Sequence, residues 1–297
     1  MRRLAGLMLL AAAVAVTLSA QNAAQDQAQP TFRSVSDAVP VHVAVRRDRK
    51  LVAGLATGDF ELLDNGIRQT ISRVTMETMP VDVSLVIDTS GSVVRSMDRF
   101  RSDARRMAGM LGSQDEVRLL TFDSKVAQTI PMQSASKRLP VDSIRAGDLT
   151  SFLDATLFAL ARAPRPDRRH LVFVFTDGFD NASVAGYGML PLVASRTESV
   201  LHIVLVKVTG VPDEGAPAAR EALATAAART GGALYPPSES SGDVVAAFAQ
   251  TLDAFRHSYV LYYIPTGVPR EGWHDIAVHV TRAGTYDVAA RQRYFGG

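Results

Sequence analysis

The middle of the chain contains four short, nearly continuous apolar runs with helical patterns between them. The runs span residues 81–87, 116–122, 170–176 and 200–208. Apolar side chains recur at helical spacing in residues 97–111, 152–161, 189–197, 221–229 and 244–256. Strands buried on both faces have such uninterrupted runs, whereas strands with one wet face alternate. The alternation of strand and helix predicts an α/β fold, with a doubly wound, mainly parallel sheet and helices on both faces.

The segments on either side of this region have the pattern of β structure. Before it, valines alternate with other residues, and Asn65-Gly66 stands between two apolar runs, where it predicts a hairpin. After it, strand patterns return. We predict that residues 38–79 and 258–297 pack into one small β-sandwich-like module, into which a domain of residues 80–257 is inserted. The alternative is two separate flanking pieces.

The first thirty residues have the order of a signal peptide. Arg2 and Arg3 precede the apolar run 4–18, and small and polar residues follow it. The run is shorter than the roughly 20 residues that a membrane-spanning helix needs. We therefore expect residues 1–20 to be a cleaved signal peptide and residues 21–37 a polar linker, which predicts a periplasmic or secreted protein without a membrane span. An uncleaved anchor is the alternative.

Composition excludes several classes of protein. The hydrophobic fraction of 47% and the charged fraction of 21% are close to globular averages, so a disordered or collagen-like chain is excluded. The formal net charge is only +2, and no basic run is interleaved with aromatic residues, so we expect no nucleic-acid partner. Because the chain has no cysteine, it can form no disulfide framework, and its stability must come from the core.

Oxygen-bearing side chains follow two of the apolar runs. Asp88-Thr89-Ser90-Gly91-Ser92 comes after the first run, Asp177 comes after the third, and Thr150 lies just before a predicted helix. In a doubly wound sheet, ligands bind in loops at the carboxyl ends of the strands, so these three loops can converge. Two carboxylates and three hydroxyls suit a hard cation such as Mg²⁺ or Mn²⁺. An open coordination position on that ion would attract a carboxylate from outside.

This pattern resembles the metal-ion-dependent adhesion site of von Willebrand factor type A domains. It consists of Asp88-x-Ser90-x-Ser92 at a strand end, a threonine before a helix, and a later Thr176-Asp177-Gly178. The resemblance covers residues 80–257. It implies that Ser90, Ser92 and Thr150 are hydroxyl ligands, and that Asp88 and Asp177 hold the ion directly or through water.

The resemblance also carries expectations about ligands and origin. It implies Mg²⁺ or Mn²⁺ as the ion, with Ca²⁺ less favoured, and a protein partner that presents an Asp or Glu carboxylate. The flanks, including residues 59–66, resemble an exported bacterial subgroup of such proteins. One departure concerns the threonine loop, where the family commonly has Gly-Gly directly before the threonine. Here Asp148-Leu149 follows Gly147, so the loop backbone can differ or Asp148 can add charge near the ion.

The same residues are open to other interpretations. Asp-Thr-Ser-Gly-Ser alone is compatible with a turn and a helix cap. An aspartic-protease dyad would need glycine directly after Thr89, and no Gly-x-Ser-x-Gly elbow marks a serine nucleophile. The six histidines lie mainly in strand patterns and are expected to be structural. Residues 177–181 faintly resemble a calcium loop without its distal glutamate.

These observations together predict a metal-dependent protein-binding or adhesion module and not an enzyme. The alternative is a structural or assembly protein of the cell envelope with an idle metal site. Candidates for the rim of the site, which would select the partner, are Val93, Val94, Arg95, Phe152, Phe179 and Tyr187.

Overall fold

The computed structural model describes residues 38–48, 50–76, 79–163, 165, 167–206, 217–238 and 241–296. The segments predicted as signal peptide and linker, residues 1–20 and 21–37, lie outside the described residues. The described part contains fifteen β-strands and five α-helices. None of these helices has the length and apolar character needed to cross a membrane.

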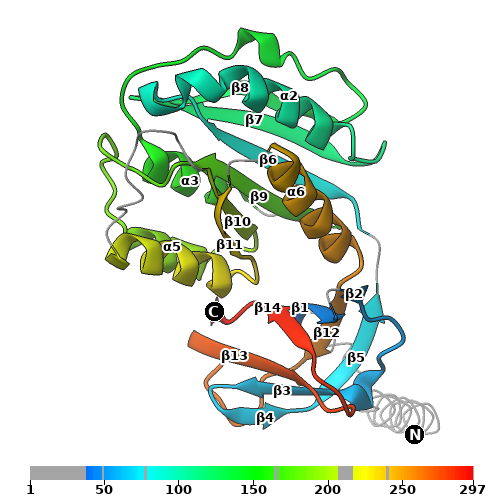
Figure 1. Ribbon diagram of the computed structural model, residues 1–297. Helices are drawn as coiled ribbons and strands as arrows, with labels where there is room; N and C mark the ends of the chain where they lie inside the picture. Colours follow the sequence, from blue (N-terminus) through cyan, green and yellow to red (C-terminus); the bar gives the residue numbers. More distant parts are fainter. Residues whose placement is uncertain are drawn as a thin grey trace, which may run out of the picture. The chain divides into compact units, whose positions relative to one another are not determined.

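A six-stranded sheet occupies the centre of the described chain, with the strand order β11-β10-β9-β6-β7-β8 (Figure 1). Its strands are β6 (Val81–Asp88), β7 (Glu116–Phe122), β8 (Val126–Ser134), β9 (Arg169–Thr176), β10 (Val200–Val206) and β11 (Leu234–Ser238). Neighbouring strands are parallel except β7 and β8, which are antiparallel. Every residue of β6 is buried, as expected for a central strand covered on both faces.

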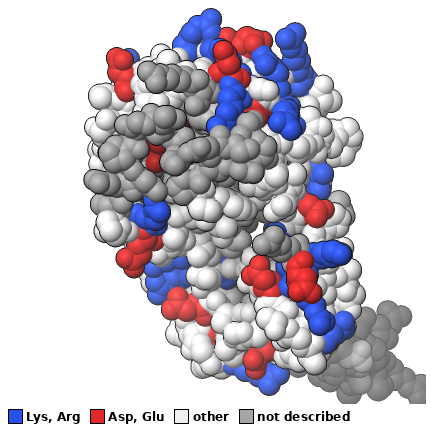
Figure 2. Space-filling model, viewed as in Figure 1, with Lys and Arg blue, Asp and Glu red and all other residues white. Residues whose placement is uncertain are grey.

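Helices cover both faces of this sheet. They are α2 (Met97–Ala108), α3 (Phe152–Leu160), α4 (Met189–Ala194), α5 (Pro217–Arg229) and α6 (Ser241–Arg256). Because side chains alternate across a strand, Leu85 belongs to a core shared with α2 and α6, whereas Val86 belongs to a core shared with α3, α4 and α5. The outer face of α2 carries arginines, and Figure 2 shows basic side chains mixed with acidic ones at the α2 and β8 end.

Two antiparallel sheets are built from the residues on either side of the central sheet. One has the order β14-β1-β12-β5, with β2 paired to β1, and the other has the order β15-β13-β3-β4. The strands that precede the central sheet are β1 (Val39–Arg47), β2 (Lys50–Leu51), β3 (Phe60–Asp64), β4 (Ile67–Gln69) and β5 (Ile71–Met76). Those that follow it are β12 (Tyr259–Tyr263), β13 (Gly272–Val280), β14 (Asp287–Ala290) and β15 (Arg293–Gly296). A third apolar core, which includes Val43, Leu62 and Leu261, joins them.

Short connections complete the fold. Three 3₁₀ turns are present in the described residues: η1 (Thr57–Asp59), η2 (Gly91–Ser96) and η3 (Val141–Ser143). The predicted hairpin joins β3 to β4, with Asn65 and Gly66 at φ values of 49° and 77°. Positive φ at both central positions is the requirement that favours Asn-Gly in such turns.

The expectation of a doubly wound, mainly parallel α/β fold is wrong for this chain. Nine of the fifteen described strands lie in the two antiparallel sheets, and the central sheet itself ends in the antiparallel strand β8. The physical reason lies in burial. Strands covered on both faces produce conspicuous apolar runs, whereas half-exposed strands such as β5 and β8 mix polar and apolar residues and contribute little to such a pattern.

Candidate functional site

The predicted site residues follow two adjacent strands of the central sheet. β6 ends at Asp88, and β9 ends at Thr176, directly before Asp177. The two strands are paired and parallel, with Ile87 opposite Phe175. Their carboxyl ends therefore open at the same edge of the sheet, which brings the two aspartates into neighbouring loops.

Four of the five predicted residues form one hydrogen-bonded cluster. The backbone N–H of Ser90 donates to Oδ1 of Asp88 at 2.9 Å. The hydroxyl groups of Ser90 and Ser92 lie 3.1 Å apart, and Ser92 donates to Oδ2 of Asp177 at 2.6 Å. Asp88 and Ser90 are buried, whereas Ser92 is exposed and Asp177 is partly exposed. The cluster thus reaches from the buried end of β6 to the surface.

Thr150 is held beside this cluster by its backbone. Its N–H donates to the side chain of Asn181 at 2.8 Å, and its carbonyl oxygen accepts from the N–H groups of Asn181 and Ala182. None of the hydrogen bonds found among the described residues joins the Thr150 hydroxyl to the other four predicted residues. The structure therefore brings the loop of Thr150 to the loop of Asp177 without a direct contact from its hydroxyl.

The threonine loop is also fastened to the Asp88 loop. Gly91 donates its N–H to the carbonyl oxygen of Asp148 at 3.1 Å, and Gly147 donates to the carbonyl oxygen of Thr89 at 2.7 Å. A Cβ atom on Gly147 would lie 2.1 Å from a carboxylate oxygen of Asp123, so this close approach requires glycine. Backbone bonds consequently hold three separate loops together at one edge of the sheet.

The charge on Asp88 is poorly compensated. Burial raises the pKa of Asp88 to about 7, and the charge of Asp177 adds to this rise, whereas hydrogen bonds from Ser90 and Thr176 oppose it. No positively charged side chain of the described residues contributes to that pKa. Buried carboxylates are normally paired or coordinate a metal ion. Two neighbouring carboxylates without a cationic side chain thus leave a site that favours a cation.

The donor set fits a hard cation. The described residues contain no group of three or more His, Cys, Asp or Glu placed to hold a metal ion. A metal ion at this edge of the sheet would therefore depend on hydroxyl oxygens as well as on Asp88 and Asp177. Oxygen-only ligands of this kind suit Mg²⁺ and Mn²⁺ better than softer metals.

Sequence patterns missed two residues that position the site. Thr176 is buried and donates its hydroxyl to Oδ2 of Asp88 at 3.0 Å, while it accepts the N–H of Gly178. Asn181 fastens Thr150, as described above. The Thr-Asp-Gly motif could have indicated Thr176. No local sequence pattern indicated that Asn181 bonds to Thr150.

The segment with a faint resemblance to a calcium loop has a different local role. One carboxylate oxygen of Asp180 accepts the backbone N–H of Leu153 at 2.8 Å and the hydroxyl of Ser183 at 2.6 Å. The N–H of Leu153 belongs to the first turn of α3, where backbone donors need a partner outside the helix. Asp180 therefore fastens the start of α3 to the loop that follows β9.

The predicted rim residues differ in exposure. Val93 and Phe152 are fully buried in the two cores and cannot contact a partner. Val94 is 48% exposed and Phe179 is 37% exposed, and Leu149, which was not a candidate, is 46% exposed. Tyr187 is half-buried and donates to the carbonyl oxygen of Gly178, and the side chain of Arg95 is not among those described.

Comparisons with known proteins identify the fold. No protein-family model matches the sequence, and a search of curated proteins finds no match. Among solved structures, the von Willebrand factor type A protein from Catenulispora acidiphila is similar over 89% of this chain and 75% of its own, with a TM-score of 0.50 and 11% identity. The ArnB paralog VWA2 from Sulfolobus acidocaldarius covers 85% and 75%, with a TM-score of 0.48 and 11% identity.

A third similar structure is the conserved hypothetical protein BatB from Bacteroides thetaiotaomicron, which covers 59% of this chain and 98% of its own. Its TM-score is 0.45 and its identity is 16%. The similarity to the Catenulispora protein extends over most of the described chain and concerns the fold alone. The resemblance seen in the sequence is thereby confirmed at the level of the fold, since this chain has a fold similar to that of a von Willebrand factor type A protein.

Proposed function

We propose that this chain is a protein-binding or adhesion module that engages an acidic residue of a partner through a divalent cation at the Asp88 site. One observation carries the proposal. Asp88, Ser90, Ser92 and Asp177 form a single hydrogen-bonded cluster that contains two carboxylates and runs from a buried strand end to the surface. The type A fold supports it, because this cluster occupies the sheet edge where the family's adhesion site is expected.

Each residue has a defined part in this proposal. Asp88 and Asp177 would supply negative charge, and Ser90, Ser92 and Thr150 would supply hydroxyl oxygens. A bound cation would neutralise the two carboxylates and offer a free coordination position to a carboxylate of the partner. Thr176 keeps Asp88 oriented through its 3.0 Å hydrogen bond. The proposal contains no catalytic step.

The choice of ion follows from the donor set. Ca²⁺ takes six to eight oxygen ligands and often a bidentate carboxylate, whereas Mg²⁺ is usually coordinated by one or two carboxylates and several waters. Two aspartates with a few hydroxyls match the smaller ion. We therefore propose Mg²⁺ or Mn²⁺ as the resident ion, in preference to Ca²⁺.

The surroundings of the cluster suit a protein surface as the ligand. Ser92 is exposed, and the neighbouring side chains of Val94 and Phe179 are both more than one-third exposed. An apolar rim around a charged centre would allow a partner to bury its own apolar side chains beside its carboxylate. The predicted signal peptide supports a location outside the cytoplasm, and we propose that the partner is met there.

Thermal melting with and without metal tests the proposal. A ligand that binds the folded state alone raises its free energy of unfolding, by about 2.7 kcal/mol at a concentration 100 times its Kd. We expect Mg²⁺ or Mn²⁺ to raise the Tm of the wild-type chain, and Ser92→Ala to remove that response. Ser136→Ala is the matched control, because Ser136 is also bonded to another serine hydroxyl but lies just after β8.

Two results would contradict the proposal. The absence of any metal response in the wild type would leave the alternative, a structural or assembly protein whose metal site is idle. A response that survives in Ser92→Ala would place the metal elsewhere. Affinity capture from the cell envelope, with Mg²⁺ and then with chelator, tests the partner. A true partner is retained by the wild type with Mg²⁺ and is lost with chelator or with Asp177→Asn.

A further inference from the structure

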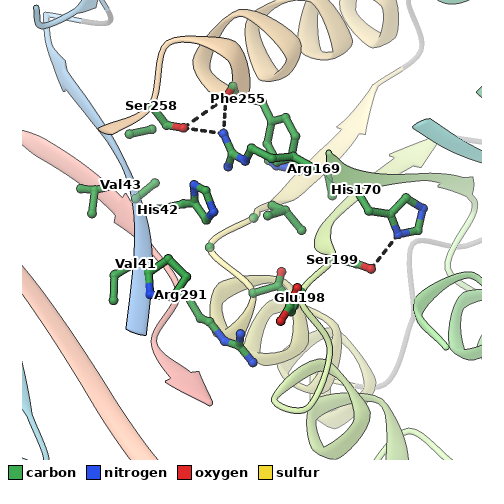
Figure 3. A pocket seen from close by; sticks show the side chains of 18 of the residues that line it. Val41, His42, Val43, Arg169, His170, Glu198, Ser199, Phe255, Ser258 and Arg291 are labelled. Atoms are coloured by element: carbon green, nitrogen blue, oxygen red, sulfur yellow. Dashed lines mark hydrogen bonds between the residues drawn. The ribbon is translucent and has the colours of Figure 1, made fainter. Parts of the chain in front are cut away.

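A second candidate site lies at the opposite edge of the central sheet from Asp88. A cavity of about 320 Å³ is bounded by β1, by the first residues of β9 and β10, by the end of α6 and by the segment from β14 to β15 (Figure 3). Arg169 and His170 begin β9, whereas the Asp88 site follows the ends of β6 and β9. The volume lies within the range of cavities that bind small molecules.

Positive charge dominates the lining of this cavity. Seven arginines and two acidic residues line it among the described residues. Of the acidic residues, Asp82 is buried and already paired with Arg162 and Arg168 at 2.6 Å each, whereas Glu198 is exposed to solvent. Arg165 also pairs with a carboxylate, because it contacts both Asp82 and Glu116. The other four lining arginines have no carboxylate within ion-pair distance among the described residues. They are Arg46, Arg169, Arg196 and Arg291.

Arg169 is a largely buried arginine, and no carboxylate of the residues that the structure describes lies within ion-pair distance of its guanidinium. Its Nη1 donates to the carbonyl oxygen of Phe255 and, at 2.5 Å, to the hydroxyl of Ser258, and its guanidinium carbon lies 3.7 Å from the centre of the Phe255 ring. Burial lowers its pKa to about 9. Both hydrogen bonds use Nη1, so Nε and Nη2 remain as donors. An uncompensated buried charge is costly, and an anion would offset that cost.

Arg291 and His42 face the same space. Arg291 donates from Nε to the carbonyl oxygen of Arg293 and from Nη2 to that of Ser195, at 2.8 and 2.9 Å, and both partners are neutral. In Figure 3 the imidazole of His42 lies between the side chains of Arg169 and Arg291. Its Nδ1 is buried and has no hydrogen-bond partner among the described residues. Burial, followed by the charges of the two arginines, lowers the pKa of His42 to about 3.

We propose that this cavity binds a small organic anion, whose carboxylate or phosphate group is held by Arg169 and Arg291. Guanidinium groups present donors in a planar fork that matches both anions. His42 would supply a neutral imidazole beside the charged group, and the apolar ring of Phe255 would contact the body of the ligand. Because the anion would contact both β1 and β9, its binding stabilises the packing of the β1 sheet against the central sheet.

Two probes test the inference on the wild-type chain and distinguish the two anion chemistries. The Tm and the binding isotherm are measured with 4-bromobenzoate, as an organic carboxylate, and with inorganic phosphate, at constant ionic strength and with chelator present. We expect at least one probe to raise the Tm. Arg169→Gln and Arg291→Gln should each weaken its binding roughly tenfold or more, because each removes a charged hydrogen-bond donor. Arg68→Gln is the control, because this side chain is 71% exposed on β4 and should leave binding unchanged.

A measurement without variants guards against a variant that fails to fold. Crystals of the wild type grown with 4-bromobenzoate should show a bromine anomalous peak inside the cavity, if the carboxylate is the preferred anion. A phosphate peak between Arg169 and Arg291 supports the other chemistry. The inference is overturned if neither probe binds the wild type, if both variants bind as the wild type does, or if the bound probe lies elsewhere. The chelator separates this test from the metal site, since the anion site needs no cation.

Discussion

Replacement of Asp88 by asparagine should stabilise the metal-free protein at alkaline pH while it abolishes the response to metal. Asp88 is fully buried, and its pKa is raised from 3.8 to about 7, first by burial and then by the charge of Asp177. An acid with a raised folded-state pKa binds more protons when folded. The free energy of unfolding therefore falls as pH rises from about 4 to about 7, and the loss is complete above that window.

The magnitude follows from that shift. Each pH unit of displacement corresponds to about 1.4 kcal/mol, so the whole shift costs about 4 kcal/mol at pH 8. Asparagine cannot ionise, so the variant does not lose this stability. Its amide has one acceptor oxygen in place of two, so it loses the hydrogen bond from Ser90 or from Thr176, which costs about 1–3 kcal/mol. We expect Asp88→Asn to be more stable than the metal-free wild type by about 1–3 kcal/mol at pH 8, and this difference to shift by about 2–3 kcal/mol in favour of the wild type at pH 5.

Urea unfolding in the presence of chelator, at pH 5 and at pH 8, measures this difference. Other titrating groups are common to both proteins, so the difference between variant and wild type isolates Asp88. With Mg²⁺ or Mn²⁺ the wild type should regain stability at pH 8 and the variant should not. If the stability difference between variant and wild type is the same at both pH values, the reasoning is refuted. Such a result would show that the pKa of Asp88 is not raised in the folded protein.

Three further changes test the fold that supports the site. Gly147→Ala should lower the Tm and weaken the metal response, because its Cβ would collide with Asp123; an unchanged Tm would show that the loop relaxes freely. Leu85→Ala removes a fully buried side chain from the central strand β6 and should cost about 2–5 kcal/mol in urea unfolding. Asp64→Ala removes the carboxylate that lies 2.8 Å from the buried Nδ1 of His274 and leaves that nitrogen without this partner. The free energy of unfolding should fall by about 3 kcal/mol, while the folded protein keeps its metal response.

Much of the central sheet could be predicted from local pattern. The apolar runs at 81–87, 116–122 and 170–176 correspond closely to β6, β7 and β9, because strands buried on both faces consist mostly of apolar residues. The helical spacing at 97–111 likewise predicts α2. The fold class of the whole chain was predicted wrongly, because half-exposed antiparallel strands have a weaker pattern and their pairing partners lie far away in the chain.

The candidate site divides in the same way. Asp88, Ser90 and Ser92 are neighbours in sequence, and the strand ends before Asp88 and Asp177 indicated that the two aspartates meet. The role of Thr150 as a ligand stays a prediction, because the fastening of its loop depends on Asn181, thirty-one residues away. The positions of residues along the chain indicate which loops meet at one edge of the sheet. They do not indicate the direction in which each hydroxyl group points.

Local sequence by itself determined the buried strands, the main helices and the chemical nature of the oxygen cluster. These properties depend on periodicity and on residues adjacent in the chain. Tertiary structure alone decided the strand pairing in the antiparallel sheets and the anion cavity, whose residues His42, Arg169 and Arg291 come from three distant segments. His170, held by two serine hydroxyls, and His42, with its unpartnered Nδ1, look alike in the sequence. The partners of a buried polar atom are set by the packing of remote segments, and no local pattern encodes them.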